Sequence, residues 1–225
     1  MSLSNINMKA VKSPVAAILE WDAMEGKFRY YDTESKQRKF IDDTTFNFVV
    51  LDQLSNVSGW VSDLGVCRAE ETHNLNASPI EVKSWKDGKS TTVKKGMYKD
   101  IKDGLKTMGI KYRKIVYGMI VFSDEFSTGS IVKLDLGGCA MSQWIESNIN
   151  DGNEVSFGLA EEVQLNKMVS YKKPTFKVST PTEDVLSEAK EIDRELQEFF
   201  DSRKQKVSVA KEENVSEEYD DDVPF

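Results

Sequence analysis

The sequence predicts a mainly β domain with added helices, followed by a long amphipathic helix and an acidic tail. Short runs of β-branched and aromatic residues recur between turn signals up to about residue 178. A stripe of helical period then follows a clear start signal, and the final segment is charged without any period. We therefore divide the chain into a flexible arm (1–13), a β domain (14–178), an amphipathic helix (179–206) and a disordered acidic tail (207–225).

The first half of the β domain holds the clearest strand signals. Residues 27–32 form an aromatic run that suits a strand. In residues 44–54 Phe46, Phe48 and Val50 point to one face, and Val49 and Leu51 give the other face apolar content, which indicates a strand partly covered on both faces. Residues 60–66 are expected to continue the sheet. Residues 80–85 form a further strand, and the Asp87-Gly88 pair after it favours a hairpin turn.

The second half begins with a helix, because apolar residues between 97 and 108 recur at helical spacing and Gly109 fits its end. The elements expected after it are strands at 112–122 and 130–136, a short helix at 141–148, and strands at 155–159 and 163–171. Three strand regions, one helix and two more strands are the sequence order of an OB fold, a five-stranded Greek-key barrel. In this prediction the 97–108 helix plugs the barrel, and the elements after residue 138 are an elaboration.

The C-terminal helix has an unusually explicit start. Thr180 suits the N-cap, Pro181 suits the first helical position, and Glu183 completes a capping box. The helix carries an apolar stripe made of Val185, Ala189, Ile192, Leu196 and Phe199. Such a face has to be buried against the β domain or against another subunit.

Several function classes lack their sequence signals. No apolar run approaches the roughly 18 residues of a membrane span. Cys67, Cys139 and His73 are the only residues of their kinds and are not at metal-ligand spacing, so we expect neither a metal nor another cofactor. Phosphate-binding, serine-hydrolase and zinc-protease motifs are also missing, and we expect no enzymatic activity.

The charge of the chain is strongly segregated. The net charge is −8, but residues 211–225 hold seven acidic residues and one lysine, a net of −6. Between Lys83 and Lys114 there are eleven Lys and Arg against three Asp, a net of +8. The acidic isoelectric point of about 4.9 therefore combines two regions of opposite charge, a basic belt and a separate acidic tail.

Aromatic residues interleave with the basic belt and with the first predicted hairpin. Single-strand binders combine a positive groove for phosphates with aromatic faces on which bases stack. We therefore expect the chain to bind a nucleic-acid strand through Arg29, Tyr30, Tyr31, Arg38, Lys39, Trp60, Lys83, Trp85, Lys86, Lys89, Lys94, Lys95, Tyr98, Tyr112, Arg113 and Lys114. The alternative for each residue is ordinary: the aromatic ring belongs to the core, and the lysine lies on a solvated face.

The last six residues have the features of a docking peptide that binds another protein. Asp220, Asp221 and Asp222 precede Val223, Pro224 and Phe225. The phenyl ring can fill an apolar pocket while the terminal carboxylate meets an Arg or Lys and the aspartates reach a basic rim. The same polyanion can also occupy the chain's own nucleic-acid groove in a salt-dependent way. The alternative is a tail that serves only solubility.

The tip DDDVPF resembles the acidic tip of bacterial single-stranded DNA-binding proteins. Residues 14–172 resemble the bacteriophage single-stranded DNA-binding proteins, on the stretches 48–54, 57–60 and 95–102. The resemblance implies an OB fold, coating of single strands in DNA replication, recombination or repair, tail-mediated recruitment of replication and recombination proteins, and a place in the bacterial host cytoplasm. Val223 departs from the usual Ile or Leu, and the helix before the tail is absent from the bacterial proteins, so their tetrameric assembly does not carry over.

A second function class stays open at this point. An adaptor or inhibitor could mimic DNA with its acidic tail and bind no nucleic acid itself. That alternative predicts that the belt from Lys83 to Lys114 is dispersed over the surface, whereas a strand binder needs it along one groove. Oligomeric state, including self-association, the size of the binding site and the preference for DNA over RNA are left open by the sequence.

Overall fold

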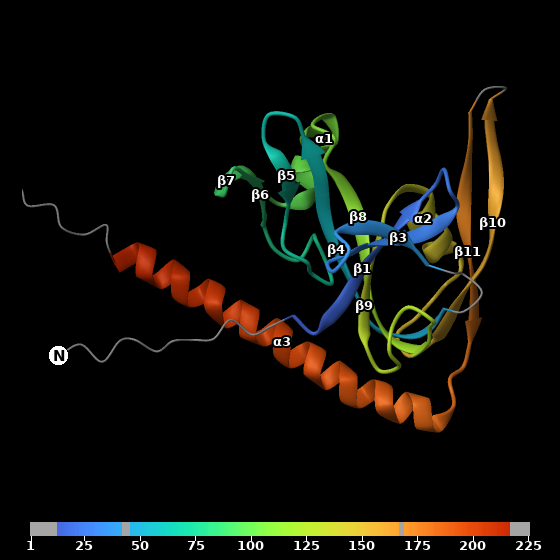
Figure 1. Ribbon diagram of the computed structural model, residues 1–225. Coiled ribbons are helices and arrows are strands. Elements are labelled where there is room, and N and C mark those ends of the chain that lie inside the picture. The colour runs from blue at the N-terminus through green and yellow to red at the C-terminus, as the bar shows by residue number, and fades with distance from the viewer. Residues whose placement is uncertain (1–12, 42–45, 167–168, 217–225) are drawn as a thin grey trace, which may run out of the picture.

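The computed structural model describes residues 13–41, 46–166 and 169–216. Within them the chain is mainly β, with one mixed sheet and three helices (Figure 1). The strands are β1 (Val15–Asp22), β2 (Lys27–Asp32), β3 (Gln37–Phe40), β4 (Asn47–Val61), β5 (Gly65–Arg68), β6 (Ile80–Lys86), β7 (Lys89–Gly96), β8 (Lys111–Phe122), β9 (Ile131–Leu136), β10 (Glu154–Asn166) and β11 (Val169–Ser179). The helices are α1 (Tyr98–Thr107), α2 (Gly138–Glu146) and α3 (Glu183–Ser216).

The sheet runs in the order β3-β2-β1-β9-β8-β4-β5-β6-β7. The start of β4 also pairs with β10, which pairs with β11. β1 lies parallel to β9, while the other strand pairs are antiparallel. The described residues thus form an open sheet of eleven strands, and the predicted closed barrel of five strands is not confirmed.

The main core lies between the curled sheet and α2. Phe28 on β2 stacks on Phe157 of β10 with ring centroids 4.2 Å apart, although the two strands are far apart in the order of the sheet. The backbone N–H of Lys172 on β11 donates to the carbonyl of Ala23 at 2.7 Å, which ties the two ends of this curl together. Trp144 of α2 fills the interior, where its indole N–H donates to a glutamine side chain on β4 at 3.0 Å.

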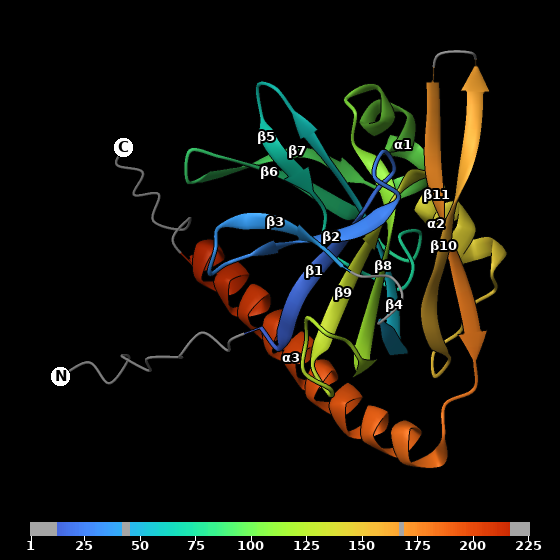
Figure 2. The same ribbon diagram turned by 45° about the vertical axis from the view of Figure 1, so that its right-hand side comes forward.

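The helix that fills this core is therefore α2 and not α1, which corrects the sequence prediction. α1 packs on β5–β7 around a separate cluster that contains Cys67, Val82, Ile101 and Leu105. In Figure 2 the β5–β7 unit projects from the sheet beside the β2–β3 hairpin. The β6–β7 hairpin turns through Asp87 and Gly88, both with positive φ (51° and 76°), as its Asp-Gly pair predicts.

α3 covers the opposite face of the sheet from α2. Ala189 and Leu196 are buried against β4, β8 and β9 in a third cluster, so the predicted apolar stripe packs on this chain's own sheet. The helix starts at Glu183, and Thr182 accepts the N–H of Val185 at 3.4 Å, so the capping residue is Thr182 in place of Thr180. α3 continues to Ser216, past residue 206, where the sequence prediction ends it. Residues 1–12 of the predicted arm and residues 217–225 of the predicted tail lie outside the described residues.

Candidate nucleic-acid interface

The face of the sheet that points away from Cys67 and Val82 carries two exposed tryptophans. Side chains alternate along a strand, and residues paired across neighbouring strands share a face. Trp60 on β4 pairs with Val66 on β5, and Val66 pairs with Trp85 on β6. These three residues form the aromatic row, with 67%, 51% and 42% of their surface exposed.

A row of cations runs beside the aromatic row on the same face. Lys111 on β8 pairs with Ser58 on β4, Ser58 pairs with Arg68 on β5, and Arg68 pairs with Lys83 on β6. We call these four residues, the cations Lys111, Arg68 and Lys83 and the serine between them, the basic row. It lies two residues along each strand from the aromatic row, about 7 Å at the rise of an antiparallel strand.

The two rows have features that internal stability does not require. Arg68 and Lys83 lie directly opposite each other, where like charges destabilise a sheet, and Glu81 on the same strand, 3.7 Å from Lys83, offsets only part of that repulsion. The Arg68 guanidinium also lies 5.3 Å from the ring centre of Trp85, a cation–π contact at an exposed site. Phosphates along the basic row and bases along the aromatic row would use both sets of side chains at once.

A hollow of about 300 Å³ opens on the same face of the sheet, over β1–β3. Its walls are Ile18, Glu20, Arg29, Tyr30, Tyr31 and Arg38. Tyr31 pairs across the hairpin with Arg38, and both side chains are exposed. The hollow therefore offers an aromatic face beside a guanidinium group.

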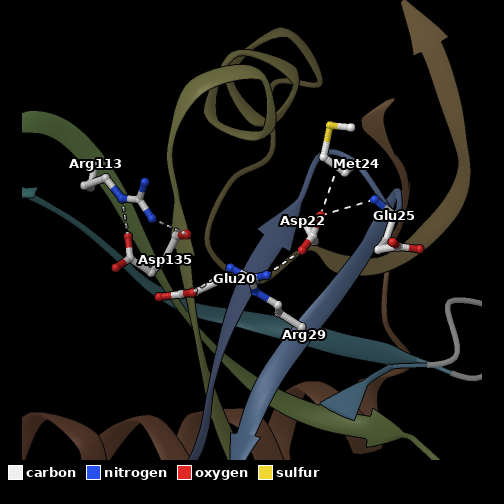
Figure 3. A network of polar contacts seen from close by, with 7 residues as sticks. All are labelled: Glu20, Asp22, Met24, Glu25, Arg29, Arg113 and Asp135. Atoms are coloured by element: carbon white, nitrogen blue, oxygen red, sulfur yellow. Dashed lines mark hydrogen bonds and ion pairs between the residues drawn. The ribbon is translucent and has the colours of Figure 1, made fainter. Parts of the chain in front are cut away.

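Ion pairs fill a strip that runs from the wall of the hollow, where Glu20 and Arg29 lie, toward the two rows (Figure 3). Arg113 on β8 donates to Asp135 on β9 at 2.6 Å, and Arg29 on β2 pairs with Asp22 and lies 3.9 Å from Glu20. Glu20 and Asp135 are partners in the β1–β9 ladder, so the two pairs are neighbours. We call these five residues the ion-pair strip; it holds three carboxylates and two guanidinium groups.

The carboxylate of Asp22 is fixed by its own turn. A hydrogen bond from the backbone N–H of Glu25, and then one from Met24, lowers the pKa of Asp22 below its usual value of 3.8, against the opposing effect of burial. The charge of Asp22 is therefore maintained at neutral pH, where it holds Arg29 in place (Figure 3). Arg29 and Arg113 are predicted site residues, but both are already paired within the protein.

α3 occupies the next part of the same face, where it covers Ile115 and Tyr117. The Tyr117 hydroxyl donates to Glu71, which also pairs with Lys133, and desolvation is the main reason that the pKa of Tyr117 lies well above 10. Gln197 of α3 donates to the buried Asp52 at 3.2 Å. α3 closes this part of the face apart from a cavity of about 210 Å³ whose walls include Leu54, Gln197 and Phe200. A ligand therefore has access to the two rows, the hollow, the ion-pair strip and this cavity.

Several predicted stacking residues have packing roles. Tyr98 and Tyr112 pack with the α1 cluster, 6.2 Å apart between ring centres, and the Tyr112 hydroxyl lies 2.7 Å from the Oγ of a buried serine. Tyr30 packs against Phe126 at 4.9 Å on the side of the main core. Of the aromatic residues predicted to bind, Trp60, Trp85 and Tyr31 are those with large exposed faces.

The predicted basic residues are divided between surfaces. Lys83 and Arg113 lie on the face described above, and Lys39 pairs with Asp32 at the rim of the β2–β3 hairpin. Lys114 points to the opposite face, where desolvation lowers its pKa. The exposed lysines of the β6–β7 hairpin are Lys86, Lys89, Lys94 and Lys95. The belt as a whole therefore does not line one groove.

The structure adds Val66, Arg68 and Lys111, which the sequence prediction leaves out of the site. The signal for Arg68 was the alternation in residues 65–68, where buried Cys67 places Val66 and Arg68 on the outer face. Lys111 lies just before the predicted start of a strand, so its face was not defined.

The remaining predicted site residues, 220–225, lie outside the described residues. Among the residues that the structure describes, no cluster of His, Cys, Asp or Glu could hold a metal ion, and no helix is long and apolar enough to cross a membrane. Comparison of the chain with protein families, curated proteins and solved structures finds no match.

Proposed function

We propose that this protein binds single-stranded DNA without sequence specificity and coats it during replication, recombination or repair. The observation that carries the proposal is the pairing of the aromatic row with the basic row on one face. Trp60 and Trp85 offer stacking surfaces to neighbouring bases, and Arg68, Lys83 and Lys111 offer charge to the phosphates beside them. The arrangement has no device for reading base edges in a duplex groove.

We also propose that the curled part of the sheet is an OB-type barrel in a permuted form. β4, β8 and β9 are antiparallel neighbours, α2 follows β9, and β10 returns to pair with β4. β1 then supplies the strand parallel to β9 from the N-terminal side of the chain. A helix between the third and fourth strands that fills the end of the barrel is what an OB fold requires.

The acidic tip is proposed to recruit replication or recombination proteins. The support for this role comes from the sequence DDDVPF, which joins three carboxylates to an apolar end and a terminal carboxylate. α3 leads from the β domain toward this tip and packs on the sheet through Leu196.

Fluorescence titration with oligo-dT tests the main proposal, because Trp60 and Trp85 report directly on stacking. We expect quenching and salt-dependent affinity: about four to six neutralised phosphates give a slope of log K against log salt of roughly −3 to −4. A flat salt response, or tighter binding to a duplex of equal length, would contradict single-strand binding.

One observation favours the adaptor or inhibitor alternative. Lys99, Lys102 and Lys106 of the basic belt lie on α1, and Lys114 lies on the opposite face from the basic row. A basic belt that is divided between surfaces in this way is what the adaptor or inhibitor alternative predicts. The same titration separates the two functions, because the adaptor gives no change in tryptophan fluorescence with any oligonucleotide.

A further inference from the structure

The hollow over β1–β3 is a second place on the binding face where an exposed aromatic ring and an unpaired guanidinium group meet. We propose that one strand of DNA is held at two separate subsites, the two rows on β4–β6 and this hollow, and that it crosses the ion-pair strip without a phosphate contact there. The inference rests on the proposed single-strand binding and specifies how the strand lies. The hollow would take one nucleotide of the strand.

The chemistry of the hollow fits a nucleotide. Tyr31 is 57% exposed and Ile18 is 48% exposed, so a base would meet an aromatic face and an aliphatic side chain. Arg38 lies opposite Tyr31 on β3, and within the described residues no ion pair engages its guanidinium. Arginine suits phosphate recognition because its planar fork can donate two parallel hydrogen bonds. A volume of about 300 Å³ accommodates one small ligand unit.

The ion-pair strip is the reason for treating the hollow as separate. Each guanidinium in the strip is already bound: Arg113 to Asp135, and Arg29 to Asp22. Glu20, which also borders the hollow, adds a further carboxylate that is 45% exposed; Arg38 balances this charge inside the hollow, whereas the strip itself carries a formal charge of −1. A phosphate placed there would meet no free cation and would be repelled by the surplus carboxylate. The ion-pair strip thus disfavours a phosphate contact, whereas the basic row and the hollow both favour one.

The distance between the subsites sets a length threshold. Four strand steps separate Trp60 on β4 from Tyr31 on β2. At about 4.8 Å per step this is about 19 Å along the sheet. Once a strand is bound at the rows, its binding to the hollow becomes intramolecular and adds affinity only if the strand can span that distance. Short oligonucleotides should therefore gain nothing from the hollow.

The test compares oligo-dT of about 4 and about 16 nucleotides, the two ends of the range of site sizes for one OB fold. The variant Tyr31→Ala/Arg38→Ala removes the aromatic face and the guanidinium of the hollow. Its matched control, Phe122→Ala/Lys99→Ala, removes one exposed aromatic ring and one exposed lysine from other surfaces. Thermal melting of each variant verifies the fold, and Arg38→Glu alone, at an exposed position, serves if the double variant does not fold.

We expect the hollow variant to bind the short oligonucleotide within about twofold of wild type and the long one roughly tenfold more weakly or worse. The control should match wild type at both lengths. Equal loss at both lengths would mean one continuous site, and no loss at either would mean that the hollow binds no nucleotide; either result overturns the inference. The variant Trp60→Ala/Trp85→Ala should weaken both lengths. If it binds both as wild type does, the proposed function fails at the rows, which is a different outcome from failure of the hollow.

Discussion

Removing charge from the basic row should weaken DNA binding at little cost in stability. The double variant Arg68→Gln/Lys83→Gln eliminates two cations that lie directly opposite each other on β5 and β6. If both serve the stability of the sheet, their loss should lower the melting temperature. If both serve the phosphates of a bound strand, their loss should appear in the affinity and in its dependence on salt.

The magnitudes follow from the geometry. Relief of the repulsion between Arg68 and Lys83 gains about 0.2–1 kcal/mol. Loss of the contact between Arg68 and Trp85, at 5.3 Å, costs about 0.5–1 kcal/mol at an exposed site. Loss of the ion pair between Lys83 and Glu81, at 3.7 Å, costs up to about 1 kcal/mol more at this exposed site. The gain offsets part of the two losses, so stability should fall by less than about 2 kcal/mol. Each lost phosphate contact reduces the salt slope for single strands by about 0.7, which gives about 1.4 for the pair.

The assay is a salt series of fluorescence titrations with oligo-dT, together with urea unfolding of each variant. The matched control is Lys99→Gln/Lys102→Gln, which removes the same charge from exposed positions on α1. We expect the control to retain nearly the full salt slope. An equal reduction in both double variants would show that net charge alone governs binding, and an unchanged slope in the first would refute the basic row as a phosphate site.

Three further predictions concern other parts of the chain. Leu196→Ala should lower the free energy of unfolding by about 2–5 kcal/mol because this α3 side chain is fully buried against the sheet, whereas Leu159→Ala at an 86% exposed position should change it by less than about 0.5 kcal/mol in urea unfolding. Asp22→Asn should lower the melting temperature at pH 7; because the folded-state pKa of Asp22 is depressed, this difference should be present above about pH 4 and disappear as the pH falls through that pKa. Deleting residues 211–225 should tighten binding to oligo-dT at low salt, whereas Phe225→Ala keeps every acidic side chain and should abolish capture of a partner enzyme with little change in DNA affinity. Capture that survives Phe225→Ala, or a gain in DNA affinity equal to that of the deletion, would contradict the separate roles of tip and charge.

Local patterns were sufficient for most of the elements. The alternation around Phe48 placed β4, and the Asp87-Gly88 pair placed the β6–β7 turn with its positive φ angles. The stripe through Ala189 and Leu196 identified the buried face of α3. These features depend on a few neighbouring residues, so the sequence contains the information that determines them.

Such local patterns do not determine how elements that are distant in the sequence pair and pack. Both α1 and α2 are short and partly apolar, and which one fills the main core depends on strand pairing between distant segments. The sequence prediction places no strand at residues 15–22, yet they form β1 because β9 offers them a parallel neighbour. The sequence prediction places the N-cap at Thr180, but the side chain that reaches a helical N–H is that of Thr182.

The candidate site shows the same division. Trp60 and Trp85 could be selected as stacking residues from their neighbours, but their alignment through Val66 required the register of three strands. Charge alone predicted Arg29 and Arg113, and only the structure places Asp22 and Asp135 against them. A cation in a sequence is a weaker candidate for a phosphate ligand when a carboxylate of the fold pairs with it closely, as Asp22 does with Arg29 and Asp135 with Arg113.

The affinity of Trp60→Ala/Trp85→Ala for oligo-dT, measured beside its thermal stability, tests single-strand binding at the aromatic row most directly. Each tryptophan should contribute about 1–3 kcal/mol to binding, while both side chains are exposed enough for the fold to tolerate their loss. Ile145→Ala, at a 61% exposed position on α2, is the control for removal of an exposed apolar side chain. We predict a large loss of affinity in the tryptophan variant alone, at a melting temperature close to that of wild type. Wild-type affinity in that variant, with the fold intact, would contradict the account.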